Sequence, residues 1–124
     1  MNDFYEITQV LNLYFDTLYY CDLDKFDIVF HERAIYATTD ETPPLFRNMN
    51  EYRQVIAKRV SPSSTNELRS DVIESIELAG KNTARARVRC SIGSRSFVDF
   101  LTLIYDNGQW RIIAKVFQII DKEK

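Results

Sequence analysis

The chain has 124 residues, 45% of them hydrophobic and 13% aromatic, which predicts one domain over residues 1–124 with a sizeable core. Sixteen basic residues against 18 acidic ones leave a net charge of −2, which argues against a dedicated nucleic-acid binder. No apolar run approaches the roughly 18 residues of a membrane span, and the N-terminus lacks a secretory pattern. We therefore expect a cytoplasmic protein that binds neither nucleic acid nor membrane.

The first half of the chain predicts two helices and a strand. Apolar residues recur at helical spacing over residues 4–20 and cover much of the helix circumference, so this helix should be embedded in the protein. A short second helix follows, capped by either Asp22 or Asp24. Residues 34–39 then predict a strand.

A third helix and four strands complete the predicted elements. The helix begins at Asn48 or Asn50, runs through Arg59 and is stopped by Pro62, which lies in a polar loop from Ser61 to Asn66. The strands are joined by short loops, which favours an antiparallel meander, and they span residues 70–78, 83–92, 95–105 and 109–120. Helices followed by a sheet indicate the α+β class.

Asp99 is the most informative residue, because the loops on either side of it set the strand register. If the loops Gly93-Ser94 and Asn107-Gly108 are two residues long, Val88 and Val116 both lie opposite Asp99. An unpartnered charged carboxylate among apolar neighbours costs several kcal/mol or more, so Asp99 requires a partner, a proton or water. The other residues predicted on its face are Ala86, Val88, Cys90, Phe97, Leu101, Leu103, Tyr105, Trp110, Ile112, Ala114 and Val116.

Glu74 has two possible orientations. A three-residue loop, Gly80-Lys81-Asn82, pairs apolar with apolar residues and sets Glu77 beside Arg85. In that register Glu74 shares the face of Asp99, whereas a bulge near Ile73 would turn it outward.

The opposite face of the last two strands is also largely apolar. Three helices suffice to cover only one face of the sheet, so a second copy of the chain is expected on the other. We expect this homodimer to form through Phe100, Ile113 and Phe117.

Two segments carry a resemblance to a known family. The segment FVDFLTLIYDNGQWRIIAKVF, residues 97–117, resembles the ending of the family labelled putative lumazine-binding, a relative of the SnoaL-like polyketide cyclases. Phe30-His31-Glu32-Arg33-Ala34 resembles that family's F-H-P-x-A segment, with Glu32 in place of the proline. The resemblance places the chain in the nuclear transport factor 2-like superfamily, of the cystatin-like type.

This resemblance implies a cone-shaped, curved antiparallel sheet, with three helices from the N-terminal half on its concave face and dimerisation through its convex face. Enzymatic relatives use a carboxylate inside the cone, often with a tyrosine or histidine, for proton transfer next to a carbonyl. The catalytic candidates are therefore Asp99, His31 and Tyr14. Purely structural roles remain open, with Asp99 bonded to a tyrosine and His31 capping a helix end.

The function hypothesis is a small-molecule-binding protein with a carboxylate in an apolar pocket, or a cofactor-free isomerase, dehydratase or cyclase. The alternative is a dimeric association module whose cone is filled by its own side chains. Neither a metal nor a cofactor is expected, because there is no histidine cluster and no glycine-rich phosphate loop, and Cys21 and Cys90 should be free thiols. The candidate pocket residues are Tyr36, Glu74, Val88, Phe97, Leu101 and Trp110.

Overall fold

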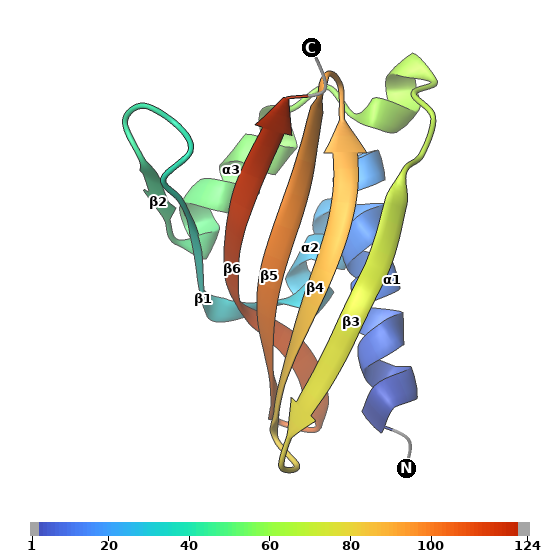
Figure 1. Ribbon diagram of the computed structural model, residues 1–124, viewed down its shortest axis with the longest axis vertical. Coiled ribbons are helices and arrows are strands. Elements are labelled where there is room, and N and C mark those ends of the chain that lie inside the picture. The colour runs from blue at the N-terminus through green and yellow to red at the C-terminus, as the bar shows by residue number, and fades with distance from the viewer. Residues whose placement is uncertain (1–2, 122–124) are drawn as a thin grey trace.

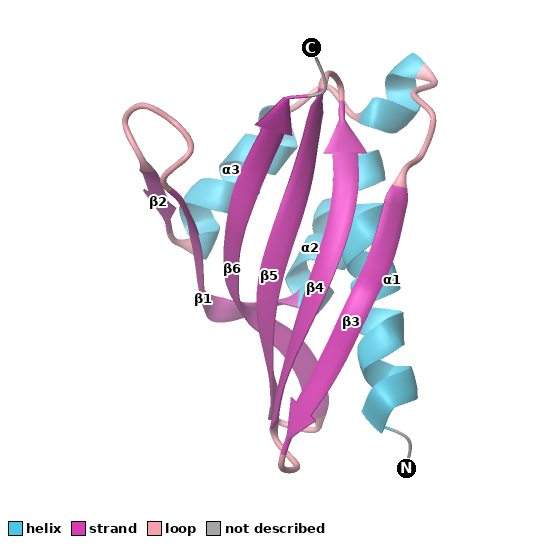
Figure 2. Ribbon diagram, viewed as in Figure 1, coloured by secondary structure: helices cyan, strands magenta, loops and turns pink. Residues whose placement is uncertain are grey.

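Three helices cover one face of a six-stranded sheet in the computed structural model, which describes residues 3–121 (Figure 1). The helices are α1 (Asp3–Tyr20), α2 (Leu23–Val29) and α3 (Met49–Lys58). The opposite face of the sheet is free of helices (Figure 2). This is the predicted α+β arrangement, and we call the space between sheet and helices the cone.

The sheet is mixed, whereas a wholly antiparallel sheet was predicted. Its strands are β1 (Phe30–Thr38), β2 (Leu45–Arg47), β3 (Asp71–Ala79), β4 (Thr83–Ile92), β5 (Arg95–Asp106) and β6 (Gln109–Asp121), in the order β2-β1-β6-β5-β4-β3. The meander of β3 to β6 is antiparallel, as predicted, but β1 pairs with β6 in parallel. The three-residue strand β2 was not predicted, because so short a segment carries no alternating pattern.

The helix caps resolve two alternatives. Asp22 caps α2, its side chain accepting a hydrogen bond from the backbone N–H of Lys25. Asn48 caps α3 through a capping box with Glu51, in which each side chain accepts from the other residue's backbone N–H. The predicted polar loop after α3 contains a short 3-10 helix, Pro62–Thr65.

Both hairpins that flank β5 have the predicted register near their turns. Asn107 and Gly108 have positive φ angles of 53° and 78°, as a type I′ turn requires. Tyr105 faces Trp110 across this turn, and Val88 faces Asp99 across the neighbouring hairpin. The predicted pairing of Glu77 with Arg85 across the loop between β3 and β4 is also confirmed.

A bulge in β6 changes the register farther from the turn. Leu103 pairs with Ile112 but Thr102 pairs with Ala114, so Ile113 is an extra residue on β6. The prediction that Val116 faces Asp99 is therefore wrong.

Beyond this bulge the alternation of β6 is reversed: residues predicted on the outer face lie on the inner face, and residues predicted on the inner face lie on the outer one. Phe117 lies opposite Asp99, and Lys115 lies opposite Leu101. Phe117 and Lys115 are buried in the cone, whereas Val116 is exposed on the outer face. The prediction that Phe117 belongs to an outer dimer face is therefore wrong.

A second bulge, in β3, corrects the prediction for Glu74. Ile73 pairs with Val88 and Ser75 with Arg87, so Glu74 is the extra residue. Its carboxylate lies on the outer face, 2.6 Å from Nε of Arg87 and 2.9 Å from Nε of Arg89. Glu74 is therefore not a pocket residue.

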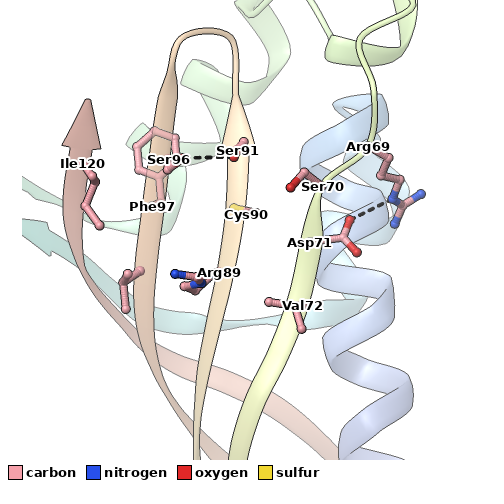
Figure 3. A pocket seen from close by; sticks show the side chains of 11 residues that line it. Arg69, Ser70, Asp71, Val72, Arg89, Cys90, Ser91, Ser96, Phe97 and Ile120 are labelled. Atoms are coloured by element: carbon pink, nitrogen blue, oxygen red, sulfur yellow. Dashed lines mark hydrogen bonds and ion pairs between the residues drawn. The ribbon is translucent and has the colours of Figure 1, made fainter. Parts of the chain in front are cut away.

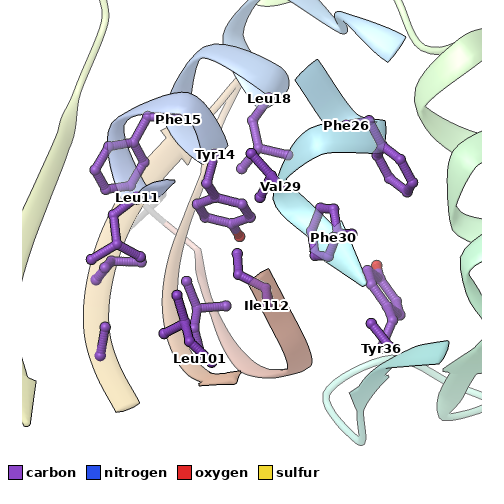
Figure 4. Packing of buried hydrophobic residues seen from close by; sticks show 14 of the residues in the cluster. Leu11, Tyr14, Phe15, Leu18, Phe26, Val29, Phe30, Tyr36, Leu101 and Ile112 are labelled. Carbon is purple, nitrogen blue, oxygen red and sulfur yellow. The ribbon is translucent and has the colours of Figure 1, made fainter. Parts of the chain in front are cut away.

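The core lies between the three helices and the inner face of the sheet. Figure 4 shows Tyr14 pointing from α1 into the interior, among Val29, Phe30, Leu101 and Ile112. Cys21 and Cys90 are free cysteines, as predicted. In the part of the chain that the structure describes, no helix has the length and apolar character needed to cross a membrane.

Candidate functional site

Asp99 and Tyr14 form a hydrogen-bonded pair at the centre of the cone. The Tyr14 hydroxyl donates to Oδ2 of Asp99 over 2.5 Å, and both side chains are 0% exposed. Oδ1 of Asp99 is buried, and no residue within 3–121 forms a hydrogen bond with it. A buried polar atom without a partner is rare in folded proteins, because its desolvation is not compensated.

Lys115 supplies a positive charge to the same interior. Its Nζ donates to the hydroxyl of Tyr52 over 2.9 Å and is buried, with the side chain 6% exposed. Four aromatic rings surround the ammonium group, with centroids 5.1 to 5.6 Å from Nζ: Tyr14, Tyr36, Tyr52 and Phe117. Cation–π attraction of this kind partly replaces the hydration that burial removes.

The charges of this cluster are set by burial and by its own members. Burial alone would lower the pKa of Lys115, but the neighbouring Tyr52 and Asp99 outweigh it and raise that pKa, so Lys115 stays an ammonium ion. Burial, followed by the charge of Asp99, raises the pKa of Tyr14 well above its usual value. Tyr14 therefore stays a neutral hydrogen-bond donor.

Four elements position these groups. Tyr14 lies on the embedded helix α1, and Asp99 lies on the central strand β5. The bulge at Ile113 turns Lys115 inward from β6, and the capped first turn of α3 brings Tyr52 to it. The cluster thus offers one free carboxylate oxygen as an acceptor and one ammonium group as a donor.

His31 is not part of this cluster. Its Nδ1 accepts from the backbone N–H of Arg33, and its Nε2 lies 3.0 Å from the carboxylate of Asp106. Asp106 is seven residues beyond Asp99 on β5, which corresponds to about 23 Å along a strand. The structure therefore joins Tyr14 to Asp99 but does not bring His31 to them.

The remaining predicted pocket residues separate into two groups. Val88, Leu101 and Phe97 surround Asp99 on the inner face, and Tyr36 faces Lys115. Trp110 instead packs against Tyr105, with ring centroids 5.4 Å apart, beside the turn between β5 and β6.

Lys115 and Tyr52 were not predicted as site residues. The even alternation of β6 assigns Lys115 to the outer face, and Tyr52 reads as part of the apolar side of α3. One signal in the sequence could have identified Lys115. The lone carboxylate of Asp99 requires a partner, and a one-residue shift in the register of β6 would turn Lys115 to the same face of the sheet.

A cavity of about 260 Å³ opens beside the cone. It is lined by Phe26, Phe30 and Met49 at its apolar floor, and by His31, Arg53 and Arg111 among its polar residues. The ring of Phe30 also packs against Tyr14 and Tyr52, with centroid distances of 5.9 and 5.7 Å. One layer of aromatic rings therefore separates this cavity from the buried cluster.

Other hollows lie on the outer face of the sheet. One of about 320 Å³ is bordered by Val72, Arg89, Ser96 and Ile120, from four different strands (Figure 3). Another, of about 470 Å³, is lined by Arg85, Arg87 and Phe100 among others. Neither is lined by Asp99 or Tyr14. No group of three or more residues suited to bind a metal ion occurs within residues 3–121.

Several solved structures share this fold. A nuclear transport factor 2-like protein of unknown function from Silicibacter pomeroyi is 20% identical with a TM-score of 0.85, over 95% of this chain and 96% of that one. One from Shewanella baltica is 22% identical with a TM-score of 0.83, over 95% and 94%. A ketosteroid isomerase-like protein from Erwinia carotovora atroseptica is 11% identical with a TM-score of 0.71, over 94% and 95%.

The sequence comparisons agree with this fold. None of the curated proteins is significantly similar to this chain. The family model described as "Putative lumazine-binding" matches residues 2–118. The chain therefore belongs to that family.

Proposed function

We propose that this chain binds a small carbonyl-bearing molecule inside the cone, with Asp99 facing the polar end of the ligand. The observation that carries the proposal is the unpartnered Oδ1 of Asp99, sealed in an apolar interior beside an ammonium group. Buried polar groups without partners are concentrated at binding and catalytic sites, because packing alone gives no reason to keep them.

The cavity beside Phe30 supports a route to Asp99. A rotation of the Phe30 ring would open a path from the cavity of about 260 Å³ to the side chains of Tyr14 and Tyr52. Ligand sites in proteins are mostly apolar with a few polar groups, which is the composition of this interior.

The chemistry we propose for the site is proton transfer without a cofactor. Oδ1 of Asp99 would take a proton from the carbon next to the ligand carbonyl and return it to another atom of the same ligand. Tyr14 would hold Oδ2 and so fix the direction of Oδ1. Isomerisation, dehydration and cyclisation are reactions of this type, and the ketosteroid isomerase-like structure shares the fold.

Lumazine, a bicyclic dione, is a suitable first probe, since the family description names it. Its intrinsic fluorescence gives a dissociation constant by titration. We expect the wild-type chain to bind it and Asp99→Asn to bind at least about tenfold more weakly, as for a lost hydrogen bond to a charged group. Asp24→Asn, an exposed aspartate on α2, is the matched control and should bind as wild type does.

Native mass spectrometry of the purified chain extends the search beyond lumazine. If the wild-type chain binds neither lumazine nor any co-purified molecule, the proposal fails. The alternative, an association module with a filled cone, would then remain.

A further inference from the structure

We infer that Lys115 is a second ligand-binding residue, which donates a hydrogen bond to the carbonyl oxygen of the molecule that Asp99 binds. This inference rests on the proposed function and goes further, because it assigns the other half of the polar contact. It also defines the chemistry of the ligand, which must present an acceptor and a donor, or an acidic C–H, side by side.

The two bulges are the first line of support. Without them, even alternation would place Glu74 and Asp99 inside the cone and Lys115 outside it. The bulge in β3 removes Glu74 to the outer face, where it pairs with Arg87 and Arg89. The bulge in β6 brings Lys115 in. Together they replace a second carboxylate in the cone by an ammonium group, and bulges next to active sites commonly re-aim a side chain in this way.

The unused hydrogen-bonding capacity of Lys115 is the second line of support. An ammonium group has three donors, and the structure gives Nζ of Lys115 one acceptor, the hydroxyl of Tyr52. Among the residues that the structure describes, no ion pair joins Lys115 to Asp99, although the charge of Asp99 helps to raise the pKa of Lys115. Spare donors and a spare acceptor therefore face the same interior without satisfying each other.

Tyr14 contacts both of these groups. Its hydroxyl bonds Asp99, while its ring lies 5.1 Å from Nζ of Lys115. A neutral carbonyl compound with an adjacent N–H, as in a lactam or imide, would match both groups at once. A carbonyl compound with an acidic adjacent C–H would match them as well. In that case Lys115 would stabilise the negative charge that develops on the oxygen when Asp99 takes the proton.

The test compares wild type, Lys115→Met and Asp99→Asn with lumazine as the probe. Methionine keeps the apolar stem of the lysine and removes the charge. Lys58→Met, at an exposed lysine on α3, is the matched control. We expect Lys115→Met to bind lumazine about 10- to 100-fold more weakly, the loss typical of a hydrogen bond from a charged donor. We also expect the carbonyl stretching frequency of bound lumazine to be higher in Lys115→Met than in wild type, in infrared difference spectra.

Each outcome supports or overturns the inference. If Lys115→Met binds as wild type does, with the same carbonyl frequency, while Asp99→Asn has lost affinity, Lys115 is not a ligand contact and the proposed function stands. If wild type binds neither lumazine nor any co-purified molecule, both fail. Should Lys115→Met not fold, ¹⁵N NMR of the lysine Nζ groups in wild type replaces it. A shift of the buried lysine signal when lumazine is added supports the inference, and an unchanged signal overturns it.

Discussion

Asp99 and Lys115 are each costly to bury alone, and each reduces the cost of the other. A carboxylate or an ammonium group loses its hydration in the cone, and an opposite charge in the same low-dielectric interior offsets part of that loss. Tyr14 and Tyr52 contribute one hydrogen bond to each. The stability of the chain should therefore depend on the two charges jointly.

A double-mutant cycle measures this dependence. We expect Asp99→Asn or Lys115→Met alone to lower the free energy of unfolding by about 3 kcal/mol, because each leaves the other charge uncompensated. The double variant should lose less than the sum of the two, by about 1 to 3 kcal/mol. Urea unfolding gives these values. The pair Asp99→Asn and Lys58→Met serves as a control and should be additive, since Lys58 is exposed on α3. Additivity of the Asp99 and Lys115 changes would contradict the coupling.

Sequence reasoning identified Asp99 and Tyr14 but not their cationic neighbour. The two turns, Gly93-Ser94 and Asn107-Gly108, set the strand register near them. That register alone predicted that Asp99 is a lone carboxylate on an apolar face of the sheet. Lys115 lies beyond the bulge at Ile113, and no local residue pattern marks that bulge. Its position follows from how β6 bends around the cone, which is a tertiary property.

At the scale of the elements, α3 holds the cationic side of the site. Its N-terminus is fixed by the capping box of Asn48 and Glu51, and its first turns carry Tyr52, whose hydroxyl accepts from Lys115. A loosened first turn would therefore affect both the helix and the ammonium group.

Asn48→Ala tests how much the cap contributes. Loss of the side-chain acceptor should lower the free energy of unfolding by about 1 kcal/mol. Asn50→Ala, two residues along and exposed within the helix, is the control and should change stability by less than about 0.5 kcal/mol. Thermal and urea unfolding report both. Equal effects of the two substitutions would show that the cap is not the cause.

The boundaries of most elements followed from local chemistry, whereas their long-range pairing did not. Caps, turns and helical spacing placed α1, α2, α3 and the meander. The parallel contact of β1 with β6 joins segments about 80 residues apart, Tyr36 with Lys115 for example, and no local pattern specifies it. The family resemblance of the C-terminal segment predicted the cone-shaped arrangement of sheet and helices. Periodicity alone could not predict it.

At the scale of the whole molecule, the outer face of the sheet carries an apolar row across four strands. Phe46 pairs with Ala37, Ala37 with Val116, and Val116 with Phe100. Phe46, Val116 and Phe100 are 71%, 46% and 57% exposed. The neighbouring part of the same face carries the charged pairs of Glu74 and Glu77 with arginines of β4. We propose that a second copy of the chain covers this row, with the charges at its rim.

Val116→Glu tests the dimer. A charge in the centre of the row should convert the dimer to a monomer, because its burial would be uncompensated. Multi-angle light scattering gives the mass. Val60→Glu is the control, since Val60 is 72% exposed and lies outside the sheet, and it should leave the mass unchanged. A wild-type chain that is already monomeric at high concentration would contradict the proposal.

The most direct measurement of the central claim is a crystal structure of the chain grown with lumazine. We expect electron density inside the cone, in contact with Oδ1 of Asp99 and Nζ of Lys115, and a displaced Phe30 ring. A cone closed over Tyr14 and Asp99 as in the unliganded chain, with lumazine absent or bound only in the hollows of the outer face, would contradict it.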